Sequence, residues 1–291
     1  MFRGFAYGLI SSCSFGLIPY FTLPLMAAGM NSCTALAYRF IFSALILALV
    51  VIWRRDPLVI DLRDILRLGL LSFFYAGAAV TFFVAFRYLD SGVCATLQFT
   101  YPVYVVLYMI CFIHEKARLS TFAAMAMSIG GVALISLHGG GHFSLWAVLL
   151  VLFSAMLNAA YVAGMQVVRL RVTSGLSITL WLMIFGAVYA VLYAMFEGAM
   201  CLPEENGQWI DLLLLAVVTG VVSNLTLVES VRRIGSTVAS VLGALEPLTA
   251  LCVGVVVFGE PLTWRGALGC ALIIAAVLLI MAAPHLGRKK A

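Results

Sequence analysis

The sequence predicts an all-α integral membrane protein in which ten transmembrane helices form two inverted five-helix repeats. Of its 291 residues, 64% are hydrophobic and only 10% are charged, whereas soluble domains carry about 25% charged residues. Ten apolar runs follow one another along the chain, each close to the roughly 20 residues with which an α-helix crosses a bilayer. A segment of the first half also recurs in the second half at a constant offset of 145 positions, the signature of an internal repeat.

Charged residues and Gly or Pro breaks separate the apolar runs. The predicted spans are residues 4–23, 33–52, 66–86, 93–113, 119–137, 144–164, 176–196, 211–230, 236–258 and 264–283. Since each half contributes an odd number of spans, the second half enters the membrane inverted relative to the first. We expect a first repeat at 1–138, a glycine-rich linker at 139–143, a second repeat at 144–283 and a basic tail at 284–291.

Lysine and arginine are distributed unequally between the two sides of the predicted bundle. Fourteen lie on the side of the termini, Arg87 and Arg265 lie on the opposite side, and Arg39 lies inside the second span. The side with the excess of basic residues faces the cytoplasm. The sequence therefore predicts a multi-pass protein of the cytoplasmic membrane, with both termini in the cytoplasm and the lipid bilayer as its surroundings.

The repeated segment covers residues 86–118 in the first half and 231–263 in the second. The two copies share an arginine, a serine, a proline and a glutamate: Arg87 and Arg232, Ser91 and Ser236, Pro102 and Pro247, and Glu115 and Glu260.

Both prolines of the repeat, Pro102 and Pro247, fall near the middle of a predicted span. Proline lacks an N–H group and crowds the carbonyl four residues earlier, so a kink is predicted in each helix, with the carbonyls of Gln98 and Gly243 freed. Freed carbonyls inside a membrane must face protein, water or a cavity. Two interpretations stay open: the kinks serve helix packing, or both line a shared substrate pathway.

The repeat reads R-x-L/I-x-S, then the proline, then an exit that begins with (G/H)-E. This pattern resembles the EamA domain of the drug/metabolite transporter superfamily, which carries two such domains in ten transmembrane helices. The resemblance covers nearly the whole chain. It implies a secondary transporter that moves a small metabolite across the membrane by alternating access, and it implies that the fifth and tenth helices lie away from the substrate path.

Arg39 lies well inside the second predicted span, whereas Arg67 and Arg265 are each the second residue of a span. The Arg39 side chain leans toward the helix N-terminus, so it can reach the outer surface and pair there with Asp90 or Glu260. Alternatively, its guanidinium fork anchors a substrate carboxylate. Similar arginines occur in the second helix of the family that the chain resembles.

The fourth span presents Gln98, Tyr101 and Tyr104 on one broad face. Tyrosine hydroxyls inside a membrane require partners, and the rings offer faces to an aromatic or cationic ligand. We take these three side chains as candidate substrate contacts. Plain helix packing is the alternative.

Further polar residues mark the sixth and eighth spans. Asn158 and Tyr161 form a pair three residues apart, and Ser223 and Asn224 belong to a polar stripe. We include these four residues in the candidate substrate site, with interhelical hydrogen bonding as the competing interpretation.

Glu246 occupies the repeat position of Tyr101, near the middle of the ninth span. A carboxylate at this depth is rare and is by default a functional candidate. Since one half offers an aromatic ring and the other a carboxylate, the substrate is predicted to be an amino acid or another amine-bearing or aromatic compound. A neutral glutamate hydrogen-bonded to a neighbouring helix is the alternative.

Other functions have weaker support in the sequence. The ionisable residues within the spans are Arg39, Glu229 and Glu246, in three different helices, whereas an enzyme needs clustered groups. His138 and His142 flank the glycines of the linker, but two histidines alone are weak evidence for a metal site, and a flexible linker is the preferred interpretation. We therefore expect no catalytic residues, metal, cofactor or nucleic-acid partner, and a small molecule as the transported ligand. An integral membrane enzyme, a channel or a scaffold protein is the alternative.

Overall fold

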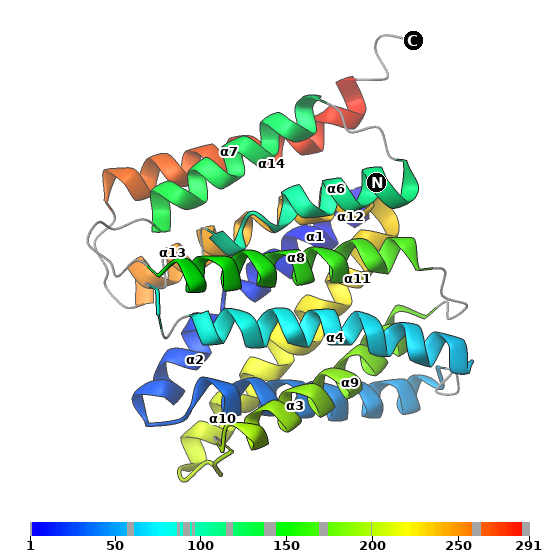
Figure 1. The fold of residues 1–291 in the computed structure, drawn as a ribbon, viewed down its shortest axis with the longest axis vertical. Helices are drawn as coiled ribbons and strands as arrows, with labels where there is room; N and C mark the ends of the chain where they lie inside the picture. Colours follow the sequence, from blue (N-terminus) through cyan, green and yellow to red (C-terminus); the bar gives the residue numbers. More distant parts are fainter. Residues whose placement is uncertain are drawn as a thin grey trace.

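The computed structural model describes residues 2–56, 61–85, 88–89, 94, 97–114, 119–136, 144–168, 174–198, 200–257 and 263–286. Within these ranges the chain is all-helical (Figure 1). Several predicted features fall outside them: the linker 139–143 with His138, the end of the basic tail, and the side chains of Arg87, Asp90, Ser91, Glu115 and Glu260.

The structure describes α-helices and one π-helix. In chain order they are α1 (Phe2–Phe15), α2 (Ile18–Ala27), α3 (Ser32–Arg54), α4 (Leu62–Ala85), α6 (Tyr101–Ile113), α7 (Leu119–Ser136), α8 (Leu145–Val167), α9 (Gly175–Phe196), α10 (Asn206–Leu215), the π-helix η1 (Ala216–Val222), α11 (Ser223–Ile234), α12 (Ser236–Leu242), α13 (Leu245–Val257) and α14 (Trp264–Leu286).

Eight helical segments of the described chain are long and apolar enough to cross a membrane. Two shorter apolar helices, Tyr101–Ile113 and Leu119–Leu134, lie where the fourth and fifth spans are predicted. The all-α membrane class is therefore confirmed, while ten crossings in two inverted repeats stay a prediction. In Figure 1, α14 ends on the side of the bundle where α1 begins, and α7 and α14 lie side by side along one edge.

The two repeat prolines lie at helix starts rather than at kinks inside continuous helices. Pro102 is in the first turn of α6, and Pro247 is the third residue of α13, which begins after a break at Gly243 and Ala244. Proline is tolerated in a first helical turn because its missing N–H has no intrahelical partner there. The prediction that the Gly243 carbonyl is freed is wrong, since it accepts a 2.9 Å hydrogen bond from the Glu246 N–H.

Helix α1 packs closely against the second half of the chain through small residues. A Cβ atom at Gly4 or Gly8 would lie 2.5 Å from Ile234 or Leu242, respectively. At Gly16, where the chain turns between α1 and α2, a Cβ would lie 2.5 Å from the backbone carbonyl oxygen of Glu246. This seam of small residues holds α1 against α11, α12 and α13, and it places the α1–α2 break beside Glu246.

We predict that Gly16→Ala destabilises the protein. The added methyl group meets a backbone oxygen and the Cβ of Thr249, both at 2.5 Å, so the helices have to separate, at about 1–3 kcal/mol. Thermal unfolding of the purified protein in detergent should show a melting temperature several degrees lower. Gly130→Ala is the matched control, because a Cβ there has no neighbour within 4 Å among the described residues. Equal melting temperatures for the two variants would contradict the prediction.

Candidate functional site

Arg39 lies buried inside the helix bundle, with 7% of its surface exposed. Its Nη2 donates a 3.1 Å hydrogen bond to the Tyr75 hydroxyl, and its guanidinium lies 5.2 Å from the centroid of the Phe40 ring. Among the described residues it forms no ion pair within 4.0 Å. Arg39 therefore does not reach the outer surface, and its predicted partners Asp90 and Glu260 lie outside the described residues.

A cavity of about 30 Å³ adjoins Arg39 between α2, α3 and α10. It is lined by Ile18, Thr22, Met26, Ser32, Ala35, Leu36, Arg39 and Leu215. This volume has room for water. Guanidinium carries five N–H donors. Within the described chain, Arg39 donates a side-chain hydrogen bond only from Nη2, to the Tyr75 hydroxyl. Its remaining donors are available to a ligand.

Tyr75 joins Arg39 to two of the predicted site residues, Tyr161 and Asn224. Asn224 Nδ2 donates to the Tyr75 hydroxyl at 3.3 Å, and the Tyr161 hydroxyl donates to Asn224 Oδ1 at 3.4 Å. The rings of Tyr75 and Tyr161 stack with centroids 4.7 Å apart. Helices α3, α4, α8 and α11 thus contribute to one buried polar network. Sequence analysis missed Tyr75, which sits in an apolar run.

The π-helix η1 fixes the position of Asn224. Asn224 Nδ2 lies 2.9 Å from the carbonyl oxygen of Gly220 and 3.3 Å from that of Thr219, so the side-chain amide satisfies backbone groups of the π-helix. Gly220 has no Cβ, which lets Ser43 of α3 approach; Ser43 Oγ donates to the Arg39 carbonyl at 2.6 Å. π-helical turns recur at functional sites. This one packs against α3 at Ser43 and at the backbone of Arg39.

Glu246 lies in the first turn of α13 and is half-buried. Its carboxylate has no hydrogen bond or ion pair among the described residues. Its backbone carbonyl adjoins Gly16, two residues before Ile18, which lines the cavity beside Arg39. An arginine of the first predicted repeat and a glutamate of the second therefore both lie near the α1–α2 break, and neither has an ionic partner in the described structure.

Two residues of the predicted aromatic face lie at the contact between α6 and the α12–α13 break. The Tyr101 hydroxyl donates to the Ser240 carbonyl at 3.0 Å, and Gly243 has no Cβ that would meet this hydroxyl. Gln98 precedes α6, and its Oε1 is buried without a hydrogen-bond partner. Tyr101 therefore already has a protein partner, whereas Gln98 keeps an acceptor for a ligand.

The remaining predicted site residues lie outside the network around Arg39. Tyr104 is half-buried and packs against the main apolar cluster. Asn158 is half-buried and forms no hydrogen bond within the described chain. Ser223 is fully buried, and its hydroxyl donates to the Val218 carbonyl at 3.1 Å. Substrate binding by any of the predicted residues stays a prediction.

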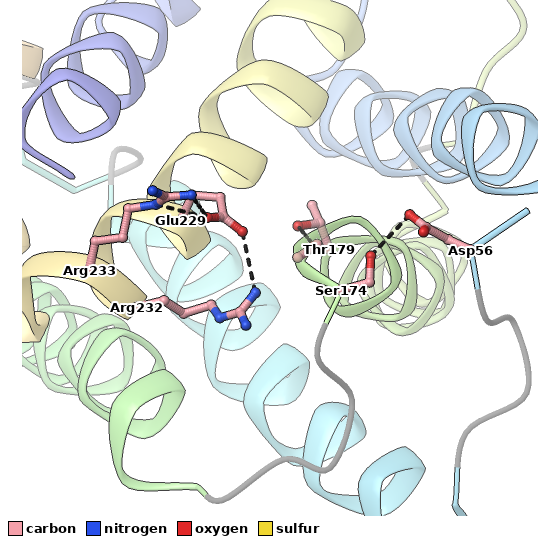
Figure 2. A network of polar contacts seen from close by, with 7 residues as sticks. Asp56, Ser174, Thr179, Glu229, Arg232 and Arg233 are labelled. Carbon is pink, nitrogen blue, oxygen red and sulfur yellow. Dashed lines mark hydrogen bonds and ion pairs between the residues drawn. The ribbon is translucent and has the colours of Figure 1, made fainter. Parts of the chain in front are cut away.

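A second polar cluster lies at the end of the bundle where α1 begins. Glu229 of α11 pairs with Arg232 at 3.3 Å and with Arg233 at 3.0 Å (Figure 2). Its carboxylate abuts Gly175, the first residue of α9, where the helix dipole favours a negative charge. The Arg233 guanidinium also lies 5.0 Å from the ring of Tyr7 in α1. Glu229 therefore has the helical ion pairs that its spacing indicates.

Ser174 extends this cluster to α3. Its hydroxyl, at the N-cap of α9, donates to Asp56 Oδ2 at 3.0 Å (Figure 2). The contacts of Glu229 and Ser174 together connect the ends of α1, α3, α9 and α11. Within the described residues, no group of three or more His, Cys, Asp or Glu side chains has a geometry that holds a metal ion.

Comparison with known proteins agrees with this architecture. Residues 2–137 and 145–282 each match the EamA-like transporter family. The chain is 26% identical over 95% of its length to YojE of Bacillus subtilis (strain 168), named an uncharacterized transporter, of which 93% is covered. It is 28% identical to YvbV of the same organism, also named an uncharacterized transporter, over 68% of this chain and 65% of that one.

This chain also superposes on a solved structure, titled only as the crystal structure of a protein, with a TM-score of 0.78 and 16% sequence identity. The superposition covers 98% of each chain, so the two proteins share a fold. The family match extends over nearly the whole sequence and over both of its halves. The chain is a multi-pass membrane protein and belongs to the EamA-like transporter family.

Proposed function

We propose that this protein is a secondary transporter of a zwitterionic small metabolite, of the amino acid class, across the cytoplasmic membrane. The observation that carries the proposal is that Arg39 and Glu246, two groups of opposite charge without ionic partners in the described chain, both lie near the α1–α2 break. The guanidinium fork suits a carboxylate, and the Glu246 carboxylate suits an ammonium group. A zwitterion bridges both groups and neutralises them together.

The same arrangement supports alternating access as the transport mechanism. Transporters with two repeats bind substrate between them, at helices interrupted near the midplane. Here the chain breaks between α1 and α2, before α6 and between α12 and α13, and two of these breaks flank Glu246 and Tyr101. The contacts of Glu229 and Ser174 connect helix ends away from these breaks. We propose that these contacts separate when the site opens toward the cytoplasm.

Counterflow tests the function. Proteoliposomes that contain the purified protein are loaded with unlabelled L-phenylalanine, and the entry of radiolabelled L-phenylalanine is followed, with other L-amino acids as competitors. We expect transient accumulation that saturates with concentration. Equilibration without saturation indicates a channel, a chemically altered product indicates an enzyme, and the absence of accumulation for every L-amino acid contradicts the proposed substrate class.

The proposed orientation is tested by thiol labelling in a cysteine-free background. Glu205, before α10, and Arg55, after α3, are both exposed and lie at opposite ends of the bundle. Because the excess of basic residues is predicted to face the cytoplasm, an impermeant maleimide added to intact cells should label Glu205→Cys and not Arg55→Cys. Permeabilised cells supply the control, in which both positions react. The reverse pattern in intact cells contradicts the orientation.

A further inference from the structure

We propose that Tyr75 contacts the substrate directly: its hydroxyl hydrogen donates to the substrate carboxylate beside the guanidinium of Arg39. This inference rests on the proposed function and adds to it a residue that sets both the selectivity and the orientation of the ligand. The basis of the inference is the pair of hydrogen bonds that the Tyr75 hydroxyl accepts from Arg39 and Asn224.

Both protein partners of the Tyr75 hydroxyl are donors. A phenol oxygen has one hydrogen to give and two lone pairs with which to accept. Arg39 Nη2, 3.1 Å away, has no acceptor, because guanidinium only donates. Asn224 Nδ2, 3.3 Å away, is identified as the nitrogen of its amide because it also faces the carbonyl oxygens of Thr219 and Gly220. Both contacts therefore direct N–H groups at the lone pairs of the phenol oxygen, with the Asn224 hydrogen shared with the Thr219 carbonyl.

The hydroxyl hydrogen of Tyr75 has no acceptor among the described residues. The side chain is 7% exposed, and its ring is fixed between that of Tyr161, stacked at 4.7 Å, and that of Phe40, edge-on at 5.4 Å. A buried O–H group without an acceptor is unfavourable, so the arrangement favours a ligand that supplies one. Two donors directed at the phenol oxygen also strengthen its own O–H as a donor.

A carboxylate is the chemical group that matches the unused donors of Tyr75 and Arg39. Its two oxygens accept from the Tyr75 O–H and from the unused N–H groups of Arg39 at the same time, in charge-assisted hydrogen bonds. An ammonium group is disfavoured here, because the lone pairs of Tyr75 are occupied and Arg39 carries the same charge. The carboxylate of a zwitterion is thereby directed to Arg39 and Tyr75, and its amine is directed to Glu246.

The test compares three probes that differ only in their charged groups: L-phenylalanine, 3-phenylpropanoate, which lacks the amine, and phenethylamine, which lacks the carboxylate. Binding to the purified protein in detergent is measured by calorimetry for wild type and Tyr75→Phe. This variant keeps both ring contacts and deletes the hydroxyl. We expect the affinities for L-phenylalanine and 3-phenylpropanoate, the two probes with a carboxylate, to fall about tenfold, the scale of one hydrogen bond to a charged group. The affinity for phenethylamine should change less than about twofold.

Tyr189→Phe is the matched control, because it deletes a tyrosine hydroxyl that bonds the Gly69 carbonyl at 3.3 Å, between α9 and α4 and outside the network. It should bind all three probes like wild type. Arg39→Lys should lose affinity for the same two carboxylates, and the double variant Arg39→Lys/Tyr75→Phe should lose less than the product of the single effects, because both residues hold one group.

Three outcomes overturn the assignment: unchanged binding to Tyr75→Phe, an equal loss for all three probes, or a wild-type protein that binds neither carboxylate. A wild-type protein that binds 3-phenylpropanoate through Tyr75 but does not transport L-phenylalanine supports the assignment and contradicts the proposed function alone. Melting temperatures within a few degrees of wild type verify that each variant is folded.

Discussion

Replacing Arg39 by methionine is expected to reduce L-amino acid counterflow by at least about 100-fold without preventing folding. The variant keeps an unbranched side chain of similar length but removes the buried guanidinium charge. A loss of this size corresponds to about 2.7 kcal/mol, within the range measured when one partner of a buried charged contact is removed. The substrate carboxylate then keeps only the Tyr75 hydroxyl.

Arg265→Met is the control for this experiment. Arg265 is exposed at the start of α14 and stacks 5.7 Å from the Trp264 ring, away from the site. Initial rates in proteoliposomes with equal protein content should match wild type for Arg265→Met and fall to background for Arg39→Met. Arg39→Lys should lie between them, because lysine keeps the charge and lacks the planar fork. Normal rates for Arg39→Met would assign Arg39 to helix packing.

The sequence predicted the fold class well, because the relevant signals are local. Apolar runs with few charges identify membrane helices from composition alone, and the described chain has eight such spans with two shorter apolar helices. The consequence of the repeat prolines was harder to predict. The break before Pro247 lies where the Tyr101 hydroxyl packs against Gly243 and bonds Ser240, 139 positions away in sequence, and such a long-range contact is not visible in the local sequence.

The candidate site was predictable only where chemistry makes a residue unusual. Arg39 and Glu246 are noticeable because charges are rare inside apolar spans. Tyr75 is one tyrosine in the run FFYAG, and its role depends on Asn224, 149 positions away. The π-helix was equally hidden, because its sequence AVVTGVV contains nothing that distinguishes it from an ordinary membrane helix.

Asn224 illustrates how a polar residue can be identified correctly and interpreted too simply. Its place in a polar stripe indicated contact with a ligand, and it does belong to the network around Arg39. However, both ends of its amide already bond to protein: Nδ2 to Gly220 and Tyr75, and Oδ1 to the Tyr161 hydroxyl. We therefore expect Asn224 to act through Tyr75, whose phenol oxygen it helps to saturate.

The second large effect is expected for Glu246→Gln. The amide keeps the shape of the side chain but cannot carry the negative charge that pairs with a substrate ammonium group. Counterflow of L-phenylalanine should therefore fall at least about 100-fold, a cost of about 2.7 kcal/mol, and phenethylamine binding should be lost. Binding of 3-phenylpropanoate, which makes no use of Glu246, should persist and even strengthen. This pattern is the converse of the one expected for Tyr75→Phe.

The pH dependence of transport gives an independent measure of the same group. A protonated carboxyl cannot pair with ammonium, so wild-type uptake of L-phenylalanine should decrease as the pH is lowered, whereas any residual uptake by Glu246→Gln should lack this acid-side decrease. Glu204→Gln, on the exposed segment before α10, should retain the wild-type profile. Superimposable rate-against-pH curves for wild type and Glu246→Gln would return Glu246 to a packing role. The two charged ends of the site are separable only because Arg39 and Glu246 form no ion pair with each other, so each charge remains available to the opposite end of a zwitterion.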